Sequence, residues 1–203
     1  NTASINLCES SSGSASATFD LTSVESTVTG GISGRTVAWY DDINLTGSIG
    51  TPASYTTISK TVYAKVTNTT TNCMNSVAVI LTVNPLPILT ASSPTVCSGS
   101  TLSLTPATGG TWLSNNTSNA TVTNAGLVTG TLTGGVAGNV TFTFTETATN
   151  CSATTSAITV NPLPNATIGA PSPANTCQNG TISMILNGSS TNTAGRPFTF
   201  AYN

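Results

Sequence analysis

The chain has 203 residues, of which 5% are charged and 5% aromatic, and its formal net charge is −2. Its four cations, Arg35, Lys60, Lys65 and Arg196, form no basic patch of the kind that binding to nucleic acid or to an anionic membrane surface requires. The longest plain apolar run, residues 77–81, is far shorter than the roughly 20 residues of a membrane-spanning helix, so we expect no membrane insertion.

The predicted elements are strands, because apolar residues alternate with polar ones wherever a period is visible. Gly-rich turns separate these runs, and no stretch has an apolar stripe with helical spacing. We therefore predict an all-β chain of tandem immunoglobulin-like antiparallel β-sandwich domains. The positions expected to face inward are Val62, Val66, Val79, Leu81, Val140, Phe142, Phe144, Ile158 and Val160.

The motif Asn-Pro-Leu-Pro occurs at residues 84–87 and again at residues 161–164, each time directly after a strand-like run that ends in Thr-Val. Two prolines within four residues end a strand and form a short, fairly stiff joint. The motif divides the chain into repeat 1 (1–87), repeat 2 (88–164) and the start of a truncated repeat 3 (165–203).

The five cysteines follow the same repeat. Cys8, Cys97 and Cys177 come early in their repeats, near the first strands, and Cys73 and Cys151 come late, near the last strands. A bond between the two would join the ends of one repeat, so we predict the disulfides Cys8–Cys73 and Cys97–Cys151, with Cys177 unpaired in this chain. A metal site is not expected, because the chain has no C-x-x-C motif and two cysteines cannot complete a tetrahedral zinc site.

Trp39 and Trp112 lie between the two cysteines of their respective repeats. An immunoglobulin core often packs a tryptophan beside the disulfide that joins its sheets, and we predict that role for both. Stacking on sugars is the alternative.

The residue types of the sequence give little support for a catalytic function. The chain has no histidine and no Gly-x-Ser-x-Gly motif, which excludes a Ser-His-Asp hydrolase triad. Asp41 and Asp42 are the one adjacent acidic pair. A calcium ligand set and a hydrolase dyad are the functional alternatives for this pair. Neighbouring strand residues face opposite ways, and calcium needs six or more oxygen ligands from several positions, so we expect this pair to end a strand in solvent. We predict no catalytic residue, no metal and no cofactor.

Particular segments resemble known modules. Residues 36–42 and 61–67, with Cys73 and the following Asn-Pro-Leu-Pro, resemble the Ig-like modules of very long surface proteins of Bacteroidota. Residues 109–112 and 119–130 resemble a bacterial group 2 Ig-like module, and residues 177–180 and 197–203 resemble the start of a PKD-like module. This resemblance implies export by the type 9 secretion system and a place in a giant surface adhesin, such as the gliding-motility adhesins.

The functional prediction is therefore a non-catalytic structural and adhesive segment of a secreted cell-surface protein. Because the sequence begins at Asn1 without a signal segment, we expect a processed protein or an internal part of a longer one. The expected partners are neighbouring domains of that longer chain, surface glycans or other copies of the same protein. Two alternatives stay open: a self-assembling extracellular filament subunit, and an accessory region of a secreted polysaccharide-degrading enzyme.

Overall fold

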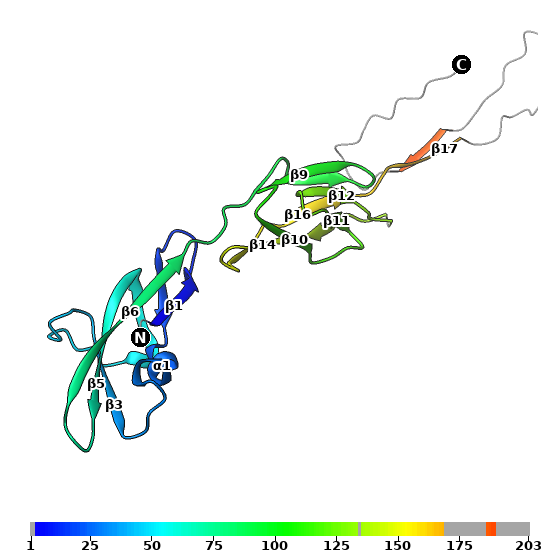
Figure 1. Cartoon of the computed structure of the whole chain (residues 1–203). Coiled ribbons are helices and arrows are strands. Elements are labelled where there is room, and N and C mark those ends of the chain that lie inside the picture. The colour runs from blue at the N-terminus through cyan, green and yellow to red at the C-terminus, as the bar shows by residue number, and fades with distance from the viewer. Residues whose placement is uncertain (1–2, 134, 169–185, 190–203) are drawn as a thin grey trace, which may run out of the picture. The chain divides into compact units, whose positions relative to one another are not determined.

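A computed structural model describes residues 3–133, 135–168 and 186–189. Contacts within the chain divide it into two compact units. The first unit comprises Asn1–Ile88 together with Glu146–Ser152, and the second comprises Leu89–Thr145 and Ala153–Asn203. Strands dominate both units, as Figure 1 shows, which confirms the all-β prediction.

The first unit is built from two sheets, one with the strand order β1-β6-β5-β3 and one with the pair β2-β4. Three short helical turns connect the strands. The strands are β1 (Ala3–Cys8), β2 (Ser16–Phe19), β3 (Arg35–Tyr40), β4 (Tyr55–Ile58), β5 (Lys60–Asn68) and β6 (Met74–Asn84), and the turns are η1 (Leu21–Val24), α1 (Glu25–Thr29) and η2 (Pro52–Ser54).

One pairing in this unit differs from the antiparallel prediction. β1 runs parallel to β6, from Ala3 opposite Val79 to Cys8 opposite Asn84. A parallel pair needs a long connection, and the intervening strands β2 to β5 supply it. The register places Cys8 beside the first residue of the Asn-Pro-Leu-Pro motif.

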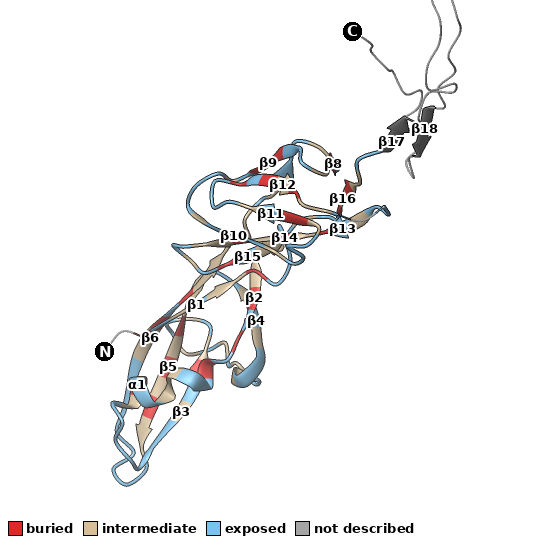
Figure 2. Ribbon diagram, turned by 90° about the vertical axis from the view of Figure 1, so that its right-hand side faces the viewer, coloured by how far each residue is buried: buried red, intermediate tan, exposed pale blue. Residues whose placement is uncertain are grey.

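The core of the first unit follows the predicted alternation. In β5 every second residue is buried while its neighbours are partly exposed, as expected for a strand with one face toward a core. Figure 2 shows the buried segments on the strands and the exposed ones mainly in the loops. The buried residues are Ala3, Ala17, Phe19, Leu21, Val28, Trp39, Val62, Ala64, Val66, Val79 and Leu81.

Up to residue 164, the described part of the second unit forms three sheets with the orders β10-β14-β15, β11-β12-β9-β7 and β13-β16-β8. Here too the pair that joins the early strand β8 to the last strand β16 is parallel, with Cys97 opposite Asn161. The strands are β7 (Thr90–Ala91), β8 (Thr95–Cys97), β9 (Thr101–Thr105), β10 (Gly110–Ser114), β11 (Ala120–Val122), β12 (Leu127–Gly130), β13 (Gly138–Val140), β14 (Phe142–Glu146), β15 (Ser152–Thr154) and β16 (Ile158–Asn161).

The core of the second unit centres on aromatic packing. The rings of Trp112 and Phe144 lie 5.0 Å apart at an interplanar angle of 53°, a favourable tilted arrangement. All nine positions predicted to face inward are buried in one core or the other. The buried residues here are Val96, Leu102, Leu104, Trp112, Ala120, Val128, Val140, Phe142, Phe144, Ile158 and Val160.

Beyond residue 164 the structure describes one antiparallel pair, β17 (Asn165–Ile168) with β18 (Leu186–Ser189). The assignment of residues 165–203 to a truncated third domain therefore stays a prediction. Within the described part of the chain, no helix is long and apolar enough to cross a membrane.

Candidate functional site

The most specific chemical feature of the chain is the disulfide between Cys8 and Cys151, with a Cα–Cα distance of 5.6 Å. This separation is usual for a disulfide. The bond connects the end of the first strand to a residue 143 positions further along the chain.

The sequence of β1 directs the Cys8 side chain away from the core. Ala3, Ile5 and Leu7 belong to the apolar cluster of the first unit, and side chains alternate between the two faces of a strand. Cys8, the next residue after Leu7, therefore lies on the opposite face. Its backbone is fixed by the pairing with Asn84.

Cys151 reaches this position from the hairpin between β14 and β15. The amide of Glu146 donates to the carbonyl of Cys151 at 2.9 Å, and the amide of Asn150 donates to the carbonyl of Glu146 at 2.9 Å. Asn150 adopts a positive φ of 59°, a conformation that asparagine tolerates better than most residues. Cys151 is fully buried.

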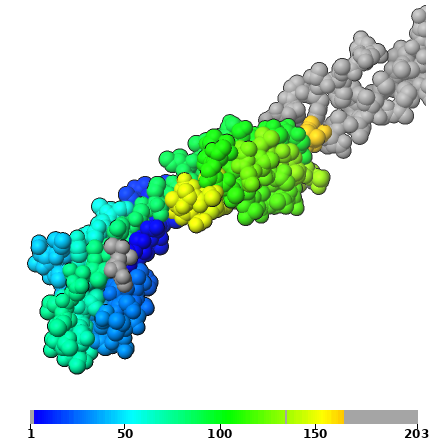
Figure 3. All heavy atoms as spheres, viewed as in Figure 1, coloured from blue at the N-terminus to red at the C-terminus, as the bar shows by residue number. Residues whose placement is uncertain are grey.

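This segment, Glu146–Ser152, belongs to the first unit although the strands on either side of it contribute to sheets of the second unit. Figure 3 shows the yellow spheres around residue 150 beside the blue spheres of the first strand. The disulfide thus connects repeat 1 covalently to the late hairpin of repeat 2.

The predicted disulfides Cys8–Cys73 and Cys97–Cys151 are wrong in this structure, because Cys73 and Cys97 are free and exposed. The strand register explains the first error. Cys8 lies opposite the last residue of β6, whereas Cys73 precedes its first residue. An 11-residue strand separates those positions by about 35 Å, but a disulfide needs Cα atoms within about 7 Å.

The second error has the same cause, since Cys97 lies opposite Asn161 at the end of β16 and Cys151 precedes β15. Cys177 lies outside the described residues, so its predicted state is not tested.

Glu9, the residue next to Cys8, is a buried carboxylate that binds three backbone amides. It accepts hydrogen bonds from Gly13, Ala15 and Leu86, each at 3.0 Å. These bonds, with that of Leu86 the largest contribution, hold the pKa of Glu9 below its usual value. Because Leu86 lies in the Asn-Pro-Leu-Pro motif, this carboxylate fixes the motif to the turn that follows Cys8.

The acidic pair lies where the sequence predicted, directly after β3. Asp42 accepts hydrogen bonds from the amides of Asn44, Thr46 and Gly47, and the amide of Gly47 contributes most to lowering its pKa. Asp41 forms an exposed ion pair with Lys60 at 3.3 Å. In the described ranges, no three acidic, cysteine or histidine side chains are grouped as a metal site would require.

Both tryptophans are buried in their cores, but neither packs beside a disulfide within its own sandwich, so that part of the prediction is wrong. The indole N–H of Trp39 donates to the carboxylate of Glu25 at 3.2 Å. The indole N–H of Trp112 donates to the carbonyl of Pro106 at 2.9 Å. Buried indoles usually find such partners, and the burial of both rings leaves neither face available to stack on a sugar.

Comparison with protein families supports a disulfide between domains. Residues 4–87 match the Flavobacterium inter-domain disulphide bond domain. The matched segment contains Cys8 and Cys73, and it supports the coarser part of the expected resemblance, an Ig-like domain of the Bacteroidota.

Several solved structures are similar to parts of this chain. The Ig1-2 module of the Drosophila receptor tyrosine phosphatase DLAR is 9% identical, with 64% of this chain and 84% of that chain covered and a TM-score of 0.25. Domains 4–9 of the surface layer protein SbsC are 17% identical, with 78% and 28% covered and a TM-score of 0.26. Comparison with curated protein sequences finds no match.

Proposed function

We propose that this chain is a non-catalytic, load-bearing spacer of an extracellular surface adhesin, in which successive β-sandwich repeats are joined by disulfides as well as by the backbone. The observation that carries this proposal is the Cys8–Cys151 bond, which encloses most of two units in one covalent loop. A bond of this kind also requires an oxidising compartment, which supports a location outside the cytosol.

The position of the bond determines which residues can bear tension. When the chain is pulled from its two ends, the shortest covalent path runs through residues 1–8, the disulfide and residues 151–203. Residues 9–150 then lie in a closed loop outside this path. Unfolding of the parts of the two sandwiches that lie within residues 9–150 cannot lengthen the pulled chain, which is a useful property for a tether under shear.

The solvent faces of the sheets are built from hydroxyls rather than charges. Exposed threonine pairs bond across neighbouring strands, with Oγ1–Oγ1 distances of 2.8 Å for Thr18 and Thr56 and 2.9 Å for Thr143 and Thr154. Such pairs stabilise a sheet with little dependence on salt. This surface also suits hydrogen bonding to glycans, which we propose as the chemical class that an adhesive face would contact.

A role without turnover of substrate fits the chemistry of the side chains. The sequence has no histidine, and Glu9 and Asp42 are engaged with backbone amides. By the resemblance of its repeats, we further propose that the parent protein is a giant Bacteroidota adhesin of the gliding-motility type, exported by the type 9 secretion system.

Single-molecule pulling from residues 1 and 203 tests the load-bearing role. With the disulfide intact, unfolding should release no length from residues 9–150. Addition of a reductant should release the 143-residue loop, about 490 Å at roughly 3.4 Å per extended residue. Release of that length under oxidising conditions would refute the proposal, and Cys73→Ser is the control that should leave the pulling curve unchanged.

A further inference from the structure

The two free cysteines occupy positions that correspond to the two bonded ones. Cys73 lies in the hairpin of repeat 1 in the same turn that carries Cys151 in repeat 2. The amide of Asn68 donates to the carbonyl of Cys73 at 2.9 Å, and the amide of Asn72 donates to the carbonyl of Asn68 at 2.9 Å. Asn72 has a φ of 59°, the same value as Asn150.

Cys97 corresponds to Cys8 in the same way. Each is the last residue of a strand that runs parallel to the final strand of its repeat, and each lies opposite the asparagine of an Asn-Pro-Leu-Pro motif. The next residue in both cases donates its amide to that asparagine's carbonyl at 2.8 Å, Glu9 to Asn84 and Ser98 to Asn161. Repeats 1 and 2 therefore each present one strand-end cysteine and one hairpin cysteine.

The bond that is formed joins the strand-end cysteine of repeat 1 to the hairpin cysteine of repeat 2. We propose that this rule continues along the parent protein. Cys97 then bonds to the hairpin cysteine of the repeat that follows repeat 2, and Cys73 bonds to the strand-end cysteine of a repeat that precedes repeat 1. The partner of each is thus a neighbouring β-sandwich with a cysteine at the complementary position.

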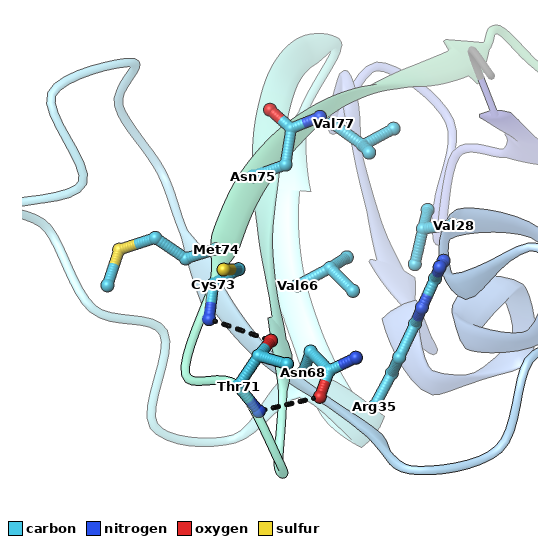
Figure 4. A pocket seen from close by; sticks show the side chains of 9 residues that line it. All are labelled: Val28, Arg35, Val66, Asn68, Thr71, Cys73, Met74, Asn75 and Val77. Carbon is cyan, nitrogen blue, oxygen red and sulfur yellow. Dashed lines mark hydrogen bonds between the residues drawn. The ribbon is translucent and has the colours of Figure 1, made fainter.

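Cys73 and its neighbours are more exposed than Cys151, as expected for a hairpin cysteine that has no partner strand packed against it. Cys151, which has its partner, is fully buried, whereas Cys73 is exposed and the next residue, Met74, is 62% exposed. Beside Cys73 lies a cavity of about 300 Å³ whose lining includes Val66, Val77 and Arg35 (Figure 4). A strand end from a preceding sandwich would cover this cavity, whose lining also includes the polar side chains of Asn68 and Asn75, and bring its cysteine to Cys73.

Formation of each bond requires an external disulfide as oxidant, such as that of a thiol–disulfide oxidoreductase. The two protein thiols form one S–S bond, the external S–S bond is broken, and its two sulfurs leave as thiols that carry the two protons. The reaction is the same for Cys97 and Cys73, and it is the one that forms Cys8–Cys151.

This inference rests on the proposed function, because it needs repeats on both sides. The test uses the full-length protein, isolated in N-ethylmaleimide to block free thiols and then mapped by non-reducing peptide mass spectrometry. Cys97 should be linked to a peptide from beyond residue 203, and Cys73 to a peptide from before residue 1. Neither should carry the maleimide. In the isolated 203-residue chain, both should carry it.

The Cys97→Ser variant of the full-length protein provides a second readout. It should expose one new maleimide-reactive thiol, located in the repeat that follows, while Cys8–Cys151 stays intact. Maleimide on Cys73 or Cys97 of the unmodified protein would overturn the inference yet leave the spacer role standing, because the Cys8–Cys151 loop does not depend on them. A Cys73–Cys97 bond between two chains would overturn it in favour of a covalent filament.

Discussion

The carboxylate of Glu9 accepts a hydrogen bond at 3.0 Å from the backbone amide of Leu86, 77 residues away, directly beside the disulfide at Cys8. Two separate attachments therefore fix the end of strand β1. The disulfide binds it to the hairpin at Cys151, and Glu9 binds it to the Asn-Pro-Leu-Pro motif that leaves the first unit.

The Glu9→Gln substitution should weaken this second attachment. The neutral amide accepts weaker hydrogen bonds than a carboxylate from Gly13, Ala15 and Leu86. We expect a lower midpoint of urea unfolding at pH 7 and faster amide hydrogen exchange at Leu86. Asp41→Asn is the matched control, since its carboxylate forms an exposed ion pair with Lys60, and it should change the midpoint little.

The pH dependence of stability should reflect the same carboxylate. Because the folded state lowers the pKa of Glu9, its contribution is present above the unfolded pKa, near 4.3, and is lost as the pH falls through the folded pKa. The difference in unfolding midpoint between the parent and Glu9→Gln should shrink over that acidic range. A difference that grows on acidification would contradict the assignment.

Removal of the disulfide should destabilise the chain strongly. In Cys8→Ser or Cys151→Ser, the loss of a bond that closes a 143-residue loop should lower the free energy of unfolding by roughly 2–5 kcal/mol, measured in urea without reductant. Cys73→Ser is the matched control, because the same turn carries a free thiol there. Equal losses in Cys73→Ser and Cys151→Ser would be inconsistent with the observed bond.

The close approach of Gly110 to the core of the second unit gives a separate prediction. A methyl group at this position would meet the ring of Phe144 and the carbonyl of Thr145. Gly110→Ala should therefore destabilise the second unit by about 1–3 kcal/mol through overpacking, detected as an earlier loss of tryptophan fluorescence from Trp112 in urea. Gly135→Ala, where the added methyl would meet nothing within 4 Å, should have little effect.

The turn that presents Cys151 depends on the positive φ of Asn150. Glycine adopts this conformation freely, whereas a β-branched residue is strained in it by about 1–2 kcal/mol. Asn150→Val should slow formation of Cys8–Cys151 during oxidative refolding, and Asn150→Gly should not. Asn72→Val strains the equivalent turn at Cys73 and should leave the rate unchanged; a slower rate there would point to a general folding defect.

The alternation of apolar residues was sufficient to predict the class of fold and the nine inward positions, but not the other core residues, such as Phe19 and Leu104. Val62, Val79 and Phe142 are buried as expected because a strand with one wet face permits one register for its apolar side. The position of the Asn-Pro-Leu-Pro motif at the end of β6 also follows from local sequence.

The disulfide pairing could not be predicted in that way, because it depends on how strands distant in sequence align. Once β1 is parallel to β6, Cys8 lies beside Asn84 and the whole length of β6 separates it from Cys73. The residues next to Cys8 and next to Cys73 do not reveal this strand register. The repeat did hold a signal: Thr-Asn-Cys occurs at residues 71–73 and at residues 149–151, which marks both late cysteines as members of one type of turn.

The most direct test of this account is non-reducing peptide mapping of the 203-residue chain, folded under oxidising conditions and alkylated before digestion. The structure predicts that the peptides containing Cys8 and Cys151 are recovered as one disulfide-linked species, and that Cys73 and Cys97 are alkylated. Recovery of Cys8 linked to Cys73 instead would confine the bond to one repeat, return residues 74–150 to the load-bearing path and contradict the account.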